Sequence, residues 1–112
     1  AIQKAAAYAL QSDLACVERH NQIYKQRQLV MLEGLKNIGI DVKPPRGSIF
    51  IWAPVPKGYT SAEFASMVLD KTGVVITPGS AFGQYGEGYF RISLSGPDER
   101  LLEAAERIKR LL

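Results

Sequence analysis

The chain has 112 residues, a mass of 12.3 kDa and a hydrophobic fraction of 46%, which is enough for one folded domain. Its formal charge of +3 comes from basic residues interleaved with acidic ones and no nucleic-acid-binding motif accompanies them, so we expect no nucleic-acid partner. No apolar run reaches the roughly 20 residues of a membrane span and no signal peptide opens the chain, so we expect no membrane partner and a cytoplasmic location.

The single cysteine and the single histidine offer little chemistry. Cys16 cannot form an internal disulfide, and its neighbours Leu14 and Val17 predict a buried structural thiol in a reducing compartment. His20 has no second histidine or cysteine at ligand spacing, so we predict a solvated side chain and no metal site.

Residues 1–37 predict two helices. The first is expected to end near Gln11, because Ser12 and Asp13 offer a cap for a second helix that runs to about Asn37. The chain enters the first helix with no start signal, which is typical of a segment cut from a longer protein. Apolar residues recur loosely at helical spacing along the second helix, namely Leu14, Val17, Tyr24, Leu29, Leu32 and Leu35.

Two strand candidates follow. Residues 40–42 are the first, and a proline-rich break at 43–47 ends it because proline cannot donate to a ladder. The second, at 48–52, is apolar on both faces, which favours core or interface packing for Phe50 and Trp52.

A third helix is predicted by its start and stop signals. Thr60 and Glu63 have the spacing of a capping box, and Gly73 ends a helix that runs to about Lys71. The next strand is expected at residues 74–77.

A glycine-dense loop at residues 76–88 joins this strand to the last one. Its spacing matches neither a phosphate loop nor a dinucleotide-binding turn, so nucleotide binding has no support. Four glycines suit positive φ or close backbone approach, namely Gly79, Gly83, Gly86 and Gly88. Tyr85, in the same loop, is a candidate for the mouth of a pocket.

Arg91 is the candidate binding residue, because it interrupts the apolar last strand at residues 89–94. Alternation places it on the face opposite to Phe90 and Ile92. A guanidinium there needs an anionic partner, and its planar fork suits a carboxylate or phosphate held by two hydrogen bonds. The alternative is a structural ion pair with Glu87 or Asp98.

The final helix starts at Gly96–Glu99, with Pro97 expected at the first helical position and acids near the positive end of the helix dipole. The element order predicts an α+β fold, in which helices pack on one face of a small mixed sheet.

These residues resemble the C-terminal small domain of fold-type I, pyridoxal-phosphate-dependent aminotransferases of class I and II. The resemblance covers nearly the whole chain, and it is closest to the LL-diaminopimelate aminotransferases. The family resemblance rests on the long helix, Gly47–Trp52, Val75–Gly83 and Tyr89–Ser93, and the closer resemblance rests on Trp52–Ser61, Thr77–Gly83 and Gly86–Ser93.

The resemblance implies specific roles. Residues 1–12 would end the helix that links the two domains, and residues 13–112 would form the small domain, with Arg91 binding the α-carboxylate of amino-acid and 2-oxo-acid substrates. The reaction implied is amino transfer between LL-2,6-diaminopimelate, or a related amino acid, and 2-oxoglutarate. The parent enzyme would be a homodimer, in the cytoplasm or, in a plant, in the plastid stroma.

The resemblance also implies what this segment lacks. The Schiff-base lysine and the phosphate-binding groups for pyridoxal phosphate belong to the large domain, so we expect no catalytic and no cofactor-binding residue here and no activity from this segment alone. Two alternatives stay open. The chain could be a free-standing module that binds small carboxylates, or an oligomerisation module that uses the strand at Phe50–Trp52.

Overall fold

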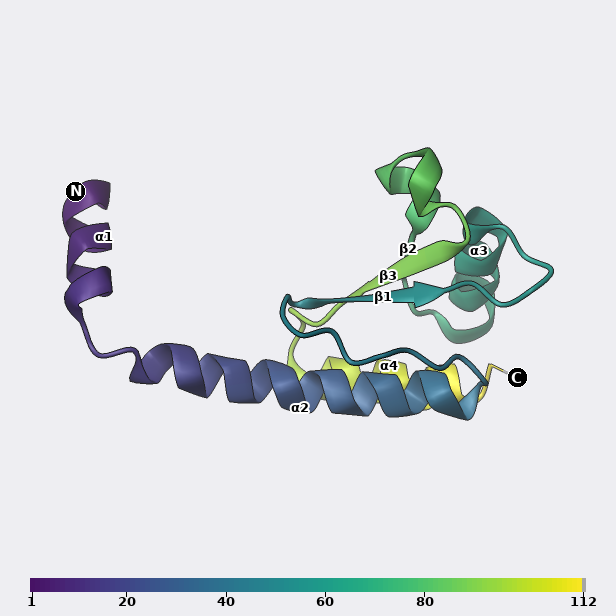
Figure 1. Ribbon diagram of the computed structural model, residues 1–112. Helices are drawn as coiled ribbons and strands as arrows, with labels where there is room; N and C mark the ends of the chain where they lie inside the picture. The colour runs from purple at the N-terminus through teal and green to yellow at the C-terminus, as the bar shows by residue number, and fades with distance from the viewer. Residues whose placement is uncertain (112) are drawn as a thin grey trace.

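The computed structural model describes residues 1–111 (Figure 1). Helices alternate with short strands along the chain, and two 3₁₀ turns occupy the glycine-dense loop. In order, the elements are α1 (Ile2–Gln11), α2 (Ala15–Asn37), β1 (Phe50–Pro54), α3 (Ser61–Thr72), β2 (Thr77–Pro78), η1 (Gly79–Phe82), η2 (Gln84–Gly86), β3 (Tyr89–Ser93) and α4 (Asp98–Lys109).

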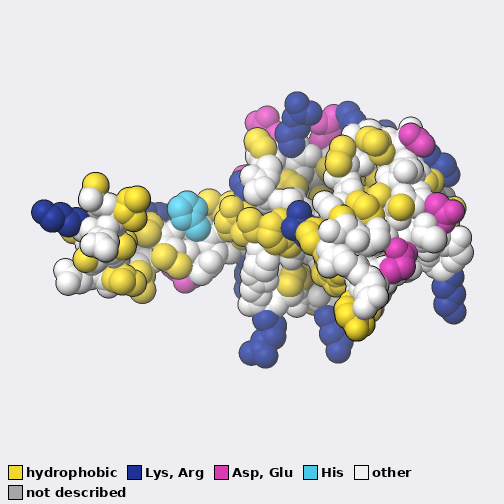
Figure 2. Space-filling model, turned by 90° about the horizontal axis from the view of Figure 1, so that it is seen from above, with side chains coloured by type: hydrophobic (Ala, Val, Ile, Leu, Met, Phe, Trp, Pro, Cys, Tyr) yellow, Lys and Arg dark blue, Asp and Glu magenta, His cyan; other side chains and the backbone are white. Residues whose placement is uncertain are grey.

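The predicted end of the first helix near Gln11 and the start of a second helix after Ser12 and Asp13 are confirmed. The Ser12 hydroxyl donates to the Tyr8 carbonyl at 2.6 Å where α1 ends, and the Asp13 carboxylate accepts from the Ala15 amide at 3.0 Å where α2 begins. Helix α1 buries none of its residues and lies apart from the rest of the molecule, as the detached arm in Figure 2 shows.

The first half of α2 is also exposed, and this corrects one prediction. Cys16 is an exposed thiol and not a buried one, because the turns of α2 that carry it extend beyond the sheet and α4 (Figure 1). Leu14 and Val17, expected to share its buried surroundings, are 62% and 46% exposed. The fully buried residues of this helix, Met31, Gly34 and Leu35, all lie in its second half.

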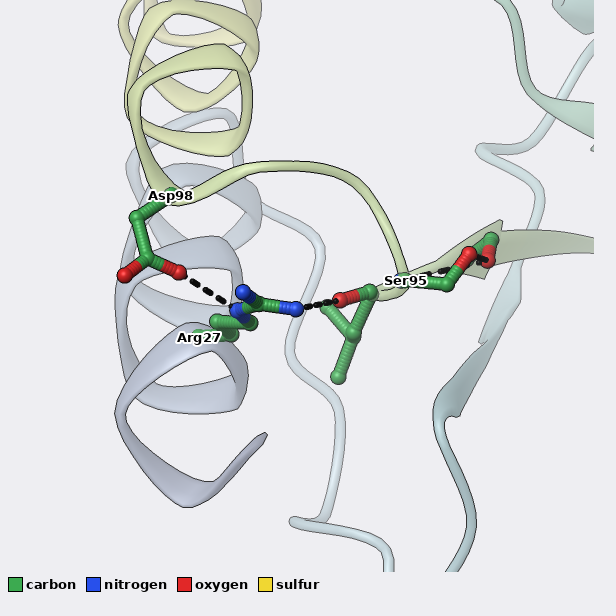
Figure 3. Close-up of polar contacts among 5 residues, drawn as sticks. Arg27, Ser95 and Asp98 are labelled. Carbon is green, nitrogen blue, oxygen red and sulfur yellow. Dashed lines mark hydrogen bonds and ion pairs between the residues drawn. The ribbon is translucent and has the colours of Figure 1, made fainter. Parts of the chain in front are cut away.

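Helix α4 lies beside α2, and a polar contact fixes the two (Figure 3). The Arg27 guanidinium donates from Nε to the Asp98 carboxylate at 2.6 Å and from a terminal nitrogen to the Leu94 carbonyl at 3.0 Å. Arg27 therefore joins α2 both to the start of α4 and to the segment that follows β3.

The sheet has the order β1-β3-β2, and both pairings are antiparallel. The α+β class is confirmed, but the expected mixed sheet is wrong for the described residues. Residues 40–42 do not form a strand: the Ile40 amide donates to the Leu35 carbonyl at 3.0 Å, and the side chain fills the core. Strand β2 is also shorter than residues 74–77, since Val75 is exposed and only Thr77 and Pro78 pair with β3.

One face of the sheet meets the helices, as predicted. Ile51 and Ala53 of β1 and Phe90 and Ile92 of β3 are buried and alternate with exposed or half-buried residues. The helices complete this core with Met31, Leu35, Phe64, Val68, Ala105 and Ile108. The opposite face of the sheet is left open.

The residues predicted to begin and end α3 are confirmed, whereas α4 begins one residue later than predicted. The Thr60 hydroxyl accepts from the Glu63 amide, the Glu63 carboxylate accepts from the Thr60 amide at 2.9 Å, and Gly73 ends α3 with φ 69°. Pro97 is the N-cap of α4 and not its first helical residue, because its ψ of 149° is extended.

Candidate functional site

Arg91 lies at the centre of the open face of the sheet. Its strand, β3, is the middle one, and the ladder places Arg91 opposite Trp52 on β1 and opposite Thr77 on β2. Because Phe90 and Ile92 point into the core, strand alternation turns Arg91 away from it. The sequence prediction for the orientation of this residue is confirmed.

Aromatic rings, and not acids, surround the Arg91 guanidinium. Its central carbon lies 4.2 Å from the centre of the Phe50 ring and 4.6 Å from that of Phe82. Within residues 1–111 the guanidinium makes no hydrogen bond or ion pair, and its Nε is buried without a partner. A buried donor of this kind lacks the acceptor that such groups normally have.

The two acids considered as ion-pair partners of Arg91 are engaged elsewhere. Asp98 pairs with Arg27, and the Glu87 carboxylate accepts from the Ser61 amide at 2.7 Å. The structural ion-pair interpretation is therefore wrong for this structure. No acid among the described residues pairs with Arg91, and the fork geometry of a guanidinium is one that suits a carboxylate.

The glycine-dense loop is folded tightly back on itself. The backbones of Gly79 and Gly86 approach so closely that a Cβ on Gly79 would overlap the Gly86 carbonyl and would lie 2.6 Å from the Tyr89 carbonyl. The predicted need for glycine is confirmed here as close backbone approach. This fold places Phe82, at the end of η1, against Arg91.

Glu87 anchors the same loop to the start of α3. Besides accepting from the Ser61 amide, its carboxylate accepts from the Ser61 hydroxyl at 2.8 Å and from the Gly88 amide at 3.1 Å. The Ser61 hydroxyl also accepts from the Ser80 amide at 3.3 Å. The hydrogen bonds from Ser61, followed by that from Gly88, lower the pKa of Glu87 below its ordinary value, because they stabilise the charged carboxylate.

A Glu87→Gln variant is expected to lose less unfolding free energy than the wild type when the pH is lowered. Because the pKa of Glu87 is lowered by folding, its contribution is fully present above the ordinary pKa of 4.5 and is lost as the pH falls through the lower folded value. Urea denaturation between pH 3 and pH 7 would therefore show a stability difference between wild type and variant that is larger at pH 7 than at pH 3. Asp41→Asn, which removes an exposed carboxylate from a loop, is the control; equal pH profiles for wild type and Glu87→Gln would contradict the anchor.

Three half-exposed aromatic side chains surround the position of Arg91. The Trp52 ring stacks on Tyr89 with centroids 5.7 Å apart and meets Phe82 edge-on at 5.6 Å. Phe50 and Trp52 lie on the open face and not in the core of the described residues, so core packing is wrong for them and interface packing stays a prediction. Tyr85 is 91% exposed, and its place at a pocket mouth stays a prediction.

The sequence predicts the face on which Arg91 lies but not the aromatic residues that contact its guanidinium or the acid that anchors the loop. Phe50 shares the face of Trp52 by strand alternation, which is the one signal that could have identified it. The contacts of Phe82 and Glu87 depend on how the loop folds over β3 and α3, and local sequence patterns do not report this.

Other kinds of site have less support in the described residues. Within positions 1–111 no group of three or more histidine, cysteine, aspartate or glutamate side chains is placed to hold a metal ion. Nor does any helix of this part combine the length and apolar character needed to cross a membrane. A large groove runs along α2 and the start of α4, away from Arg91, and is lined by residues such as Gln26, Leu29 and Leu102.

Comparison with known proteins places the chain among aminotransferases. The family model described as aminotransferase class I and II matches residues 1–108. The LL-diaminopimelate aminotransferase of Aquifex aeolicus (strain VF5) is 50% identical over 111 residues, which cover 99% of this chain and 29% of the relative. The enzyme of the same name from Moorella thermoacetica is 46% identical over 112 residues, covering 100% of this chain and 29% of the relative.

Solved structures give the same result for the fold. The aromatic aminotransferase from Pyrococcus horikoshii matches with a TM-score of 0.88 and 38% identity, over 97% of this chain and 30% of that structure. A probable N-succinyldiaminopimelate aminotransferase from Thermus thermophilus matches with a TM-score of 0.80 and 38% identity, over 93% of this chain and 28% of that structure. The chain thus spans less than a third of the length of each of these relatives.

Proposed function

The chain belongs to the aminotransferase class I and II family, and from this premise we propose that it is the C-terminal small domain of an enzyme that transfers an amino group. The donor we propose is LL-2,6-diaminopimelate or a related amino acid, and the acceptor is 2-oxoglutarate. The names of the relatives that are 50% and 46% identical to this chain support the choice of donor.

We propose that residues 1–12 end the helix that links two domains and that residues 13–112 form the small domain. The isolation of α1 supports this division, since it buries none of its residues and carries exposed apolar side chains at Ile2, Tyr8 and Leu10. Such a helix needs another surface to cover it. The remainder of a longer polypeptide would supply that surface, and the parent enzyme would be a homodimer.

The observation that carries the proposed function is the free guanidinium of Arg91. It lies on the open face of the sheet, two aromatic rings contact it, and no acid of the described chain neutralises it. Every amino-acid donor and 2-oxo-acid acceptor carries an α-carboxylate, which this fork can bind through two hydrogen bonds. One residue would therefore orient the substrate in both halves of the reaction.

Enzymes of this family depend on pyridoxal phosphate, which acts as an electron sink when it is bound. The residues described here do not fit a site for it. Six of the seven lysines are exposed, and Lys109 pairs with Glu106 at 2.6 Å, so none is placed to hold the cofactor covalently in a protected pocket. We assign the cofactor site to the large domain and expect the 112-residue segment alone to be inactive.

The contribution of this chain to the reaction would be binding, orientation and the exclusion of water. The open face with Arg91 would close over the substrate held by the large domain, and the rim formed by Phe82, Trp52 and Tyr89 would shield the carboxylate from solvent. Excluding water strengthens the charged hydrogen bonds that fix the substrate.

The proposal is tested with the full-length protein that carries this chain. Purified with pyridoxal phosphate, it is incubated with LL-2,6-diaminopimelate and 2-oxoglutarate, and glutamate formation is followed. We expect turnover by the full-length protein and none by the 112-residue segment. Turnover with other amino acids but not with LL-2,6-diaminopimelate would overturn the donor, and the absence of turnover with any amino acid would overturn the proposed function.

A further inference from the structure

The two phenylalanine rings at Arg91 come from separate parts of the fold. Phe50 is the first residue of β1, two positions before Trp52 and on the same face of the sheet, whereas Phe82 closes η1 in the glycine-dense loop. A guanidinium within about 6 Å of an aromatic ring centre is attracted by the ring's electron-rich face. At 4.2 and 4.6 Å, both rings lie well inside this range.

Phe82 is held in place from several directions. The edge-on contact with Trp52 supports its ring, and the close approach of Gly79 to Gly86 fixes the turn that carries it. Two residues before Phe82, the Ser80 amide donates to the buried Ser61 hydroxyl, which Glu87 also holds. The ring is therefore a fixed element of the loop, although half of its surface is exposed.

No hydrogen bond or ion pair within the described residues orients Arg91, so its contacts with the two rings become important. An arginine side chain has many rotamers, and a binding site pays for ordering such a group when the ligand arrives unless the group is already held. Hydrogen bonds or an ion pair usually provide this order, yet Arg91 has neither within residues 1–111, and its Nε is buried without a partner. The faces of the rings are the contacts that remain to fix the plane of the guanidinium.

We propose that Phe82 is a positioning residue for carboxylate binding, which holds the Arg91 guanidinium in one plane before the substrate arrives so that its N–H edge is available to the carboxylate. This inference rests on the proposed function, since it assumes that Arg91 binds a carboxylate. In addition to Arg91, Phe82 would then contribute to the affinity for every carboxylate substrate, because it acts through Arg91.

Two substitutions separate the effect of the aromatic ring of Phe82 from the effect of its size. In the full-length holoenzyme, Phe82→Leu keeps an apolar side chain but removes the ring, whereas Phe82→Tyr keeps the ring and can point its hydroxyl towards solvent. Tyr59→Leu is the matched control, because it removes a 45% exposed aromatic side chain whose ring contacts Phe64 and not Arg91. The probe is maleate, a dicarboxylate with no amino or keto group, and its Kd is measured by calorimetry.

We expect Phe82→Leu to raise the Kd of maleate about 3- to 10-fold, the size of a cation–π contact at a partly exposed site. The KM for the amino donor should rise by a similar factor with little change in kcat, since ground state and transition state use the same Arg91 contact. Phe82→Tyr and Tyr59→Leu should both stay within about 2-fold of wild type.

Arg91→Ala separates a failure of this inference from a failure of the proposed function. If Arg91→Ala abolishes maleate binding but Phe82→Leu binds like wild type, the positioning role is overturned and the proposed function stands. If Arg91→Ala leaves binding unchanged, the proposed function itself fails. Thermal denaturation of each variant checks the fold. If Phe82→Leu is unstable, the maleate affinities of Phe82→Tyr and Phe50→Leu test the proposal instead. The aromatic mechanism would be overturned if Phe82→Tyr lost affinity, or if a folded Phe50→Leu variant kept it.

Discussion

Arg91→Ala is expected to weaken the binding of both the amino donor and the 2-oxo-acid acceptor by about 30-fold to several thousand-fold, corresponding to about 2 to 5 kcal/mol. The loss is large because a carboxylate in a closed site would be left without its charged partner. Both substrates should be affected, since both carry an α-carboxylate. The measurement is the Kd of each substrate and of maleate for the full-length enzyme.

The stability of the protein should change little in the same variant. Arg91 makes no hydrogen bond or ion pair within residues 1–111, so its removal breaks no polar contact of the described fold and eliminates a buried Nε that has no partner. The contacts of its guanidinium with the Phe50 and Phe82 rings are lost, and we expect a change in unfolding free energy within about 1 kcal/mol.

Two further variants test whether the planar fork of Arg91, and not positive charge in general, accounts for the binding. Arg91→Lys keeps the positive charge but loses the planar fork, so it should recover only part of the affinity. Arg100→Ala removes an exposed arginine from α4 and should leave binding unchanged. If Arg91→Ala destabilised the fold by several kcal/mol and left affinity intact, Arg91 would be a structural residue.

The parts of the fold that local sequence determines were predicted well. The capping box of Thr60 and Glu63 and the stop at Gly73 depend on residues within three or four positions, and both are present in the structure. The orientation of Arg91 follows from strand alternation, which is equally local. In each case the physical cause lies within one turn or one strand.

The errors occur where the end of a helix or a distant segment decides the structure. Residues 40–42 read as a strand, but the Leu35 carbonyl takes the Ile40 amide and the core takes its side chain. Cys16 was expected inside because its neighbours are apolar, yet no described segment covers that turn of α2. The link between Arg27 and Asp98 spans 71 positions, a separation that no local pattern can report.

Gly79→Ala is expected to destabilise the protein strongly, because the loop leaves no room for a side chain at this position. The added Cβ would overlap the Gly86 carbonyl and lie 2.6 Å from the Tyr89 carbonyl, and both are backbone atoms that cannot rotate away. The loop would have to open, at a cost of about 3 kcal/mol or more, the upper end of the range for overpacked sites. Such a loss is a large fraction of the stability of a typical domain.

The same substitution should also reduce carboxylate affinity, because opening the turn between Gly79 and Gly86 moves Phe82 away from Arg91. Chemical denaturation and maleate binding would measure the two effects. Gly47→Ala is the matched control: a Cβ there would meet no atom within 4 Å, so the change in unfolding free energy should stay within about 0.5 kcal/mol. A Gly79→Ala protein as stable as Gly47→Ala would mean that the two backbones separate at little cost, and the loop could then not hold Phe82 in place.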